Sequence, residues 1–199
     1  MNAVMDIEII RAISERQGGV FTTSDLRTAL ADPHSASLTR RVHRLIAHGV
    51  LRRFARGFYT ATDFVPERLV CRMVPGACIS FETVLAAKLV IGPAPTRRIV
   101  ATKLGAARRF KAADLKLDFV SLSSHLMFGC TNEGGIRRAD AEKAVLDTLY
   151  FHLRGRRYSF DVYSDLNLTK LDSARLQDYL ARYPNPKFRA FAGRVLKLP

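Results

Sequence analysis

Six arginines that have no acidic neighbour are the side chains of this sequence with the clearest chemistry. Arginine binds phosphate groups and the edges of guanine bases through its guanidinium group. The six are Arg40, Arg41, Arg44, Arg52, Arg53 and Arg56, and the 30 residues between Asp32 and Asp63 contain no Asp or Glu. Charges of one sign repel each other, and a bound polyanion offsets this repulsion. The segment therefore indicates a nucleic-acid partner.

The first three of these arginines are predicted to lie on a helix, which Ser35 or Ser37 would cap and Gly49 would end. Apolar residues recur along it at i, i+4, i+7 and i+8, and they are Leu38, Val42, Leu45 and Ile46. The helical period of ~100° per residue then places polar side chains on the opposite face. These are Ser37, Arg40, His43 and Arg44, with Thr39 and Arg41 on the flanks.

The other three arginines belong to a predicted β-hairpin with strands at residues 50–54 and 58–60. Arg56 lies at its tip, and Gly57 can adopt the positive φ that a tight hairpin turn requires. A helix followed by an arginine-tipped hairpin is the arrangement of a winged helix-turn-helix, which binds double-stranded DNA.

Shorter elements upstream complete this fold. A helix with apolar residues between 9 and 13 ends at 18–19, and a short strand follows at 20–21. Thr22 and Asp25 have the spacing of a capping box at the start of a second helix. We therefore predict a DNA-binding domain over residues 1–62; the alternative is a small basic domain whose arginines are merely solvated. The predicted DNA-binding residues are Ser37, Thr39, Arg40, Arg41, His43, Arg44, Arg52, Arg53 and Arg56.

The remaining residues, 64–199, are expected to form a mixed α/β domain that ends in helices, so that the whole chain is α+β. Predicted helices cover residues 81–89, 140–152, 172–182 and 187–196, and predicted strands cover 98–102 and 115–122, with 125–128 as a candidate third strand. A second group of basic residues lies in the first predicted strand, just before it, and in the segment that follows it. It consists of Arg97, Arg98, Lys103, Arg108, Arg109 and Lys111. This group could extend the DNA footprint, bind a nucleic acid shared with a partner, or simply be solvated.

Composition excludes several other classes of protein. A net charge of +14 with 48% hydrophobic residues is typical of a globular protein with a basic surface. No apolar run approaches the ~20 residues that span a bilayer, and Asp6 and Glu8 lie where a signal peptide would be basic. Cys71, Cys78 and Cys130 are an odd number of cysteines without a C-x-x-C pair, so neither a disulfide framework nor a zinc site is indicated. We therefore expect a cytoplasmic protein without a membrane partner.

Catalytic patterns are weak in this sequence. The five histidines are scattered and form no metal-binding pair. Asp140, Glu142 and Asp147 lie on one predicted helix, but Asp140 and Glu142 point to different faces, and the three are better explained as charges that complement the helix dipole. We expect no enzymatic activity, no catalytic residue, no bound metal and no cofactor.

The hairpin also resembles a known family. The AbiEi-like antitoxins of type IV toxin–antitoxin systems carry a wing pattern that Gly49, Leu51, Arg53, Arg56, Gly57 and Tyr59 match. Residues 79–85 and 139–147 are similar to later segments of that family. The resemblance implies an N-terminal winged helix that represses the antitoxin's own operon, where we expect inverted repeats as the binding site. It also implies a non-catalytic C-terminal domain that counteracts a nucleotidyltransferase-like toxin.

Two other functions remain open from the sequence. The chain could be a stand-alone winged-helix transcription factor whose C-terminal domain senses a ligand or dimerises. It could also be an enzyme that acts on nucleic acid.

Overall fold

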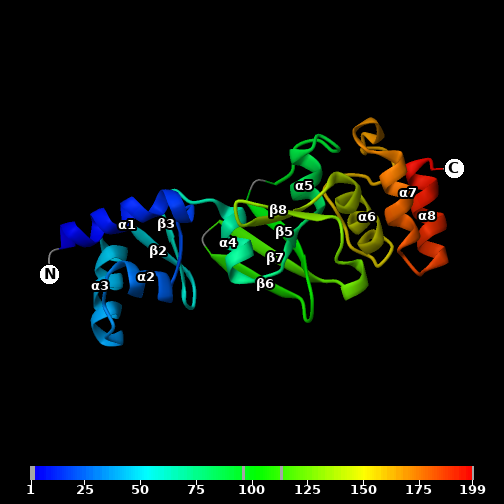
Figure 1. The fold of residues 1–199 in the computed structure, drawn as a ribbon. Coiled ribbons are helices and arrows are strands. Elements are labelled where there is room, and N and C mark those ends of the chain that lie inside the picture. The colour runs from blue at the N-terminus through cyan, green and yellow to red at the C-terminus, as the bar shows by residue number, and fades with distance from the viewer. Residues whose placement is uncertain (1–2, 96, 113, 199) are drawn as a thin grey trace. The chain divides into compact units, whose positions relative to one another are not determined.

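The computed structural model describes residues 3–95, 97–112 and 114–198 (Figure 1). The chain forms two compact units, one of residues 1–73 with 111–113 and the other of residues 74–110 with 114–199. Helices and a small sheet build the first unit, while a larger mixed sheet with helices builds the second. The predicted α+β class is thus confirmed.

The first unit has the element order that the sequence predicts. Its helices are α1 (Ala3–Gln17), α2 (Thr23–Ala29), α3 (Ser35–Ala47) and α4 (Pro66–Met73), and its strands are β1 (Val20–Thr22), β2 (Leu51–Ala55) and β3 (Phe58–Ala61). The three strands form an antiparallel sheet in the order β1-β3-β2. Helices α2 and α3 are the helix-turn-helix, and the β2–β3 hairpin is the wing.

One apolar cluster holds the winged helix together. It joins α1, β1, α2, α3 and β2 through Ile10, Phe21, Leu26, Leu30, Leu38, Val42, Leu45 and Leu51, all of which are buried. Ile46, which the periodicity places inward, is only half-buried at the edge of this cluster. The buried face of α3 is therefore the one that the sequence predicts, except that Ile46 is only partly buried.

The helix starts differ in how well the sequence predicts them. The capping box of α2 is present, since Thr22 Oγ1 accepts from Asp25 N at 3.2 Å and Thr22 N donates to Asp25 Oδ2 at 2.6 Å. In contrast, α3 begins after His34, and neither Ser35 nor Ser37 caps it. Ser37 lies inside the first turn instead, where its side chain hydrogen-bonds Asp32.

The division between the units lies after Met73, whereas the sequence predicts a boundary at residues 62–64. The reason is α4, whose Arg72 binds the winged helix. Its guanidinium donates to Gln17 Oε1 at 3.1 Å, to the Val20 carbonyl at 2.7 Å and to Asp25 Oδ2 at 2.5 Å. Helix α4 therefore extends the first unit beyond the wing.

The second unit contains a six-stranded sheet in the order β6-β7-β5-β4-β9-β8. Its strands are β4 (Cys78–Ile79), β5 (Arg98–Lys103), β6 (Arg108–Ala112), β7 (Leu115–Ser121), β8 (Cys130–Glu133) and β9 (Ile136–Ala139). Strands β5 and β7 pair in parallel, as do β4 and β9, while β4 with β5 and β8 with β9 are antiparallel.

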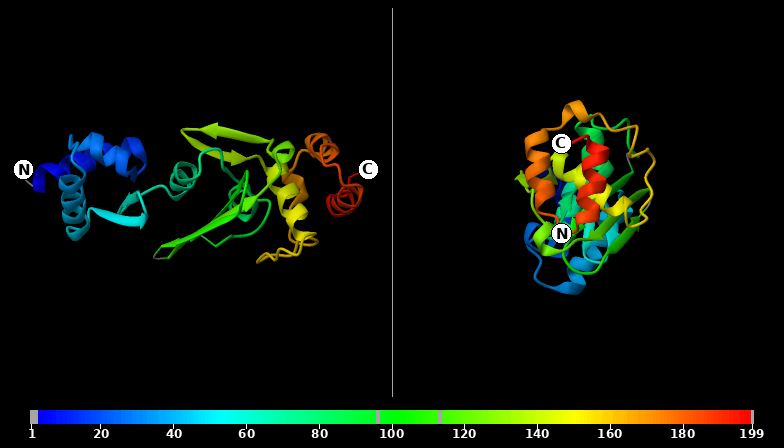
Figure 2. Two further views of the ribbon diagram at one scale, coloured as in Figure 1. Left: turned by 90° about the horizontal axis from the view of Figure 1, so that it is seen from below. Right: turned by 90° about the vertical axis from the view of Figure 1, so that its right-hand side faces the viewer.

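The helices of the second unit are α5 (Phe81–Ala87), α6 (Ala141–His152), α7 (Ser173–Ala181) and α8 (Pro186–Leu196), with short 3-10 helices η1 (Ser124–Leu126) and η2 (Leu168–Lys170). Helix α6 is the central helix, since α5, α7 and α8 all pack against it. Figure 2 shows α7 and α8 side by side next to α6.

One predicted strand of the second unit is wrong, and several of its strands are not predicted from the sequence. The candidate strand at 125–128 is absent, because η1 occupies the start of that segment. The sequence pattern predicts neither strand β6 nor the β8–β9 hairpin. Most of β8 is exposed, so it lacks the alternation of buried and exposed residues that identifies a strand from sequence.

The structure also contains a single disulfide that the cysteine spacing does not predict. Cys78 and Cys130 form a disulfide, with their Cα atoms 6.4 Å apart. They are 52 residues apart in sequence, and only the folding of the sheet brings them together. In the described part of the chain, no helix is long and apolar enough to cross a membrane.

Candidate nucleic-acid interface

Helix α3 presents a polar face to solvent because its other face is fixed in the apolar cluster. Leu38, Val42 and Leu45 are at most 4% exposed. On the opposite side, four predicted site residues are exposed together, and we call them the α3 face. They are Thr39, Arg40, His43 and Arg44.

Arg41 is a correction to the predicted DNA-binding set, because it is buried. Its guanidinium donates to both carboxylate oxygens of Asp6, at 3.0 Å and 2.5 Å, and to the Leu30 carbonyl at 2.8 Å. A second ion pair joins it to Asp32 at 3.3 Å. The hydrogen bond with Asp6 raises the pKa of Arg41. Arg41 therefore links α1, the end of α2 and α3, and it does not belong to the exposed basic surface.

Ser37 supports this buried ion pair. It is half-buried, and its hydrogen bond is the largest cause that holds the pKa of Asp32 below its usual value. The backbone N–H of His34 also donates to Asp32 Oδ1, at 3.2 Å. Ser37 thus favours the charged form of a carboxylate that pairs with Arg41, a role within the fold that the helical period alone does not reveal.

The wing presents the remaining predicted arginines. Arg52, Arg53 and Arg56 are all exposed. Gly57 has the expected positive φ, +80°, and its carbonyl accepts from the N–H of Thr23 at 3.0 Å. This bond fixes the tip of the wing to the first residue of α2, so that the wing and the helix-turn-helix are held in a defined geometry.

The charges of these two elements are uncompensated. Asp6 and Asp32 are buried with Arg41, and Asp25 pairs with Arg72. Within the described ranges, no carboxylate lies at ion-pairing distance from Arg40, Arg44, Arg52, Arg53 or Arg56. These three acids are therefore engaged in pairs within the first unit, while the arginines of the α3 face and the wing stay available for a polyanion.

The second basic group has a different environment. Arg97 pairs with Asp114, Arg98 pairs with Asp118 at 2.5 Å, and Arg109 lies 3.7 Å from the same Asp118. The ammonium group of Lys103 donates to the carbonyls of Leu104 and Ala106. Arg108 and Lys111 are exposed on β6. Most of this group is thus engaged within its own sheet, in contrast to the wing.

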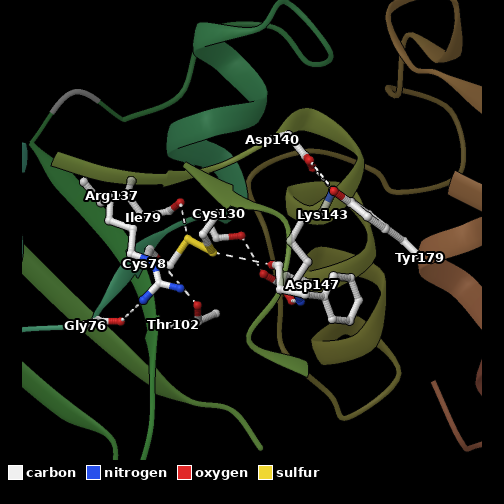
Figure 3. Close-up of a disulfide and its surroundings, with 12 residues drawn as sticks. Gly76, Cys78, Ile79, Thr102, Cys130, Arg137, Asp140, Lys143, Asp147 and Tyr179 are labelled. Carbon is white, nitrogen blue, oxygen red and sulfur yellow. Dashed lines mark hydrogen bonds and ion pairs between the residues drawn. A yellow bond between two sulfur atoms is a disulfide. The ribbon is translucent and has the colours of Figure 1, made fainter. Parts of the chain in front are cut away.

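A buried polar cluster in the second unit was not predicted. Lys143, only 1% exposed, pairs with Asp147 and donates to the Tyr183 hydroxyl at 3.1 Å. Asp147 also accepts from Ser80 Oγ at 2.7 Å, and burial raises its pKa. Figure 3 shows Lys143 and Asp147 side by side on α6. The spacing i, i+4 was the only sequence signal, and it does not distinguish a buried pair from an exposed one.

The other acids of α6 differ in role. Asp140 is the N-cap, as its Oδ1 accepts from Lys143 N at 2.8 Å, which agrees with a helix-terminal charge. Glu142 is buried and accepts from the N–H of Asp172 at 2.8 Å. Among residues 3–95, 97–112 and 114–198, no group of three His, Cys, Asp or Glu side chains has the geometry to hold a metal ion.

Comparisons with known proteins agree with this architecture. The structure is similar to the crystal structure of the RV2827C protein from Mycobacterium tuberculosis, with a TM-score of 0.63 and 14% sequence identity over 95% of this chain and 75% of that one. At this identity the likeness concerns the fold alone. No curated protein matches the sequence significantly. Residues 8–62, the span of the winged helix, match the family described as transcriptional regulator, AbiEi antitoxin.

Proposed function

We propose that this chain is a DNA-binding repressor of its own operon and the antitoxin of a type IV toxin–antitoxin system. The observation that carries the proposal is the uncompensated charge of the α3 face and the wing, in the segment that matches a family of transcriptional regulators. The neutralised toxin would be nucleotidyltransferase-like, as the family resemblance implies. Action on a promoter requires that the chain work in the cytoplasm.

In this proposal α3 enters the major groove, and the wing lies along the phosphate backbone. Arg40 and Arg44 read base edges, where each is worth ~1–3 kcal/mol of discrimination against the wrong base. Arg56, at the wing tip, contacts phosphate and contributes to affinity for every sequence alike. Because Arg41 is held by two carboxylates, it contributes only indirectly, through the position of α3.

Gel-shift titrations on the chain's own upstream region test this assignment. Arg40→Ala or Arg44→Ala should reduce the ratio of specific to non-specific binding, while Arg56→Ala should weaken both equally and flatten the salt dependence. Arg189→Ala is the matched control, because it removes one exposed charge from α8 in the other unit. If all three test variants bind the operator as the control does, the assignment of α3 and the wing is wrong.

Repression and neutralisation are tested separately. Supplied in trans, the chain should lower the output of a reporter driven by its own promoter, with inverted repeats protected in footprinting. In co-expression with the toxin, residues 74–199 should restore growth and residues 1–73 should not. Rescue by the first unit alone would reverse this division of labour.

Two results would favour the other functions. Reporter repression without any rescue by the full chain indicates a stand-alone transcription factor.

We propose that the chain acts by binding and not by catalysis. Loss of all rescue in a folded variant that lacks one exposed carboxylate, such as Glu133→Gln, would instead favour an enzyme.

A further inference from the structure

The Cys78–Cys130 disulfide joins an interior strand to an edge strand of the large sheet (Figure 3). Cys78 lies on β4, between β5 and β9, and is fully buried. Cys130 begins β8, which pairs with β9 only, and is half-buried. The two cysteines therefore differ in their exposure to solvent and in the number of neighbouring strands that pair with their own strand.

Cys78 stays in place without the bridge. Its strand is hydrogen-bonded on both sides, with Cys78 opposite Thr102 of β5 and Ile79 opposite Arg138 of β9. The Cys78 carbonyl also accepts from Thr102 Oγ1 at 3.3 Å. Reduction of the disulfide thus leaves β4 anchored, and any movement would fall on the side of Cys130.

The residues before Cys130 contact α6 and α7 closely. The ring of Phe128 lies 5.0 Å from the ring of Tyr179. The Lys143 ammonium group lies over the Phe128 ring, 4.8 Å from its centroid. The Gly129 carbonyl accepts from the N–H of Asp140 at 2.9 Å. A Cβ at Gly129 would meet Lys143 Cβ at 2.9 Å, so the backbone fits tightly against α6. The segment Phe128–Gly129–Cys130, which we call the α7 seat, therefore transmits its position to α6 and α7.

We propose that Cys78 and Cys130 form a reversible oxidation site for low-molecular-weight thiols and disulfides, and that its state controls how firmly α7 and α8 are held on the second unit. This inference goes beyond the proposed function and does not depend on it. Both the oxidised and the reduced state of the pair are compatible with the fold of the sheet. Strands β4 and β8 each pair with β9 through hydrogen bonds, and the disulfide only adds a covalent link between them.

The exchange is balanced with glutathione as the thiol. A glutathione thiolate attacks Cys130 Sγ, the Cys78–Cys130 bond breaks, and Cys78 leaves as a thiolate that takes up a proton. A second glutathione thiolate attacks the glutathione sulfur of the mixed disulfide, which releases Cys130 and glutathione disulfide. Oxidation is the reverse. Cys130 is the sulfur attacked because Cys78 is shielded from solvent.

Thiol labelling of the full chain tests the exchange. The protein is equilibrated with mixtures of reduced and oxidised glutathione, quenched in acid, alkylated after unfolding and mapped by mass spectrometry. We expect Cys78 and Cys130 to gain label together as the reduced fraction rises, while Cys71, which lies outside the disulfide, is labelled throughout. Label on both cysteines at every ratio, or on neither unless denaturant is present during the equilibration, would overturn the proposal.

Two single variants test which sulfur is attacked. With oxidised glutathione, Cys78→Ser should accumulate a glutathione adduct on Cys130, whereas Cys130→Ser should form little adduct on the buried Cys78. Equal adducts on both would contradict the assigned direction.

Hydrogen exchange tests the consequence for the helices. On reduction, amides of α7 and α8 should exchange roughly ten-fold faster or more, while those of α3 in the other unit should not change. The double variant Cys78→Ala/Cys130→Ala should match the reduced protein in both buffers. Unchanged exchange in α7 and α8 on reduction would show that the disulfide does not control the α7 seat.

Discussion

Replacement of Arg41 by alanine should destabilise the winged helix severely, even though Arg41 lies in the segment richest in DNA-binding candidates. The side chain is 7% exposed, and its two carboxylate partners are 3% and 6% exposed. Alanine would leave Asp6, Asp32 and the Leu30 carbonyl without the guanidinium that satisfies them.

The magnitude follows from burial. Removal of one partner from a buried ion pair costs about 3–5 kcal/mol, because the other charge stays desolvated and unpaired. Since all three groups are nearly inaccessible, solvent screening does not reduce this figure much. A unit of this size, residues 1–73, has a free energy of unfolding of roughly 4–11 kcal/mol at ~0.05–0.15 kcal/mol per residue. The variant should therefore lose between about a quarter and all of the stability of the first unit.

Hydrogen exchange with mass spectrometry, read on peptides of α1 and α3, measures this loss within the full chain. Urea unfolding followed by far-ultraviolet circular dichroism gives a second readout, as the chain contains no tryptophan. Arg40→Ala, on the exposed face of the same helix, is the control and should change stability by no more than about 0.5 kcal/mol. Arg41→Lys should lie in between, because a single ammonium cannot form the two-pronged bond to Asp6.

The outcome separates the two roles of an arginine on α3. If Arg41→Ala exchanges as slowly as the Arg40→Ala control and yet loses operator binding, Arg41 acts at the DNA surface and the structural reasoning fails. Loss of protection in α1 and α3 together supports the buried role.

Three further predictions concern stability and pH. The folded state lowers the pKa of Asp32, so its stabilising contribution is present above the usual value of 3.8 and is lost as the pH falls through the folded value; the urea midpoint of the first unit should drop in this acid range, and less so in Asp32→Asn. Reduction of the disulfide, whose cysteines are 52 residues apart, should destabilise the second unit by up to ~4 kcal/mol of loop-closure free energy, measured by urea unfolding with and without reductant. Burial, with a hydrogen bond to Asp140, raises the pKa of Tyr179 to about 12, so the packing of α7 should weaken as the pH rises from ~10 to about 12, and Tyr179→Phe should remove this part of the alkaline loss in a circular-dichroism titration.

The sequence by itself determined the features that depend on residues close together in the chain. The capping box joins residues three apart, the inward face of α3 follows from one helical period, and the wing turn depends on a single glycine. Each of these features follows from a local steric or hydrogen-bonding preference of the residues, which does not depend on the rest of the fold. For this reason the order of elements in the winged helix and its exposed arginines could be predicted from the amino-acid sequence alone.

Only the tertiary structure decided which charged and sulfur-bearing side chains lie inside. Arg41 meets Asp6 across 35 residues, Ser80 meets Asp147 across 67, and the two cysteines meet across 52. The helical period placed Arg41 on a flank of α3, where either a buried or an exposed position was possible, and the position of α1 settled it. Burial and pairing depend on how separate elements pack, and no periodicity within one element encodes that packing.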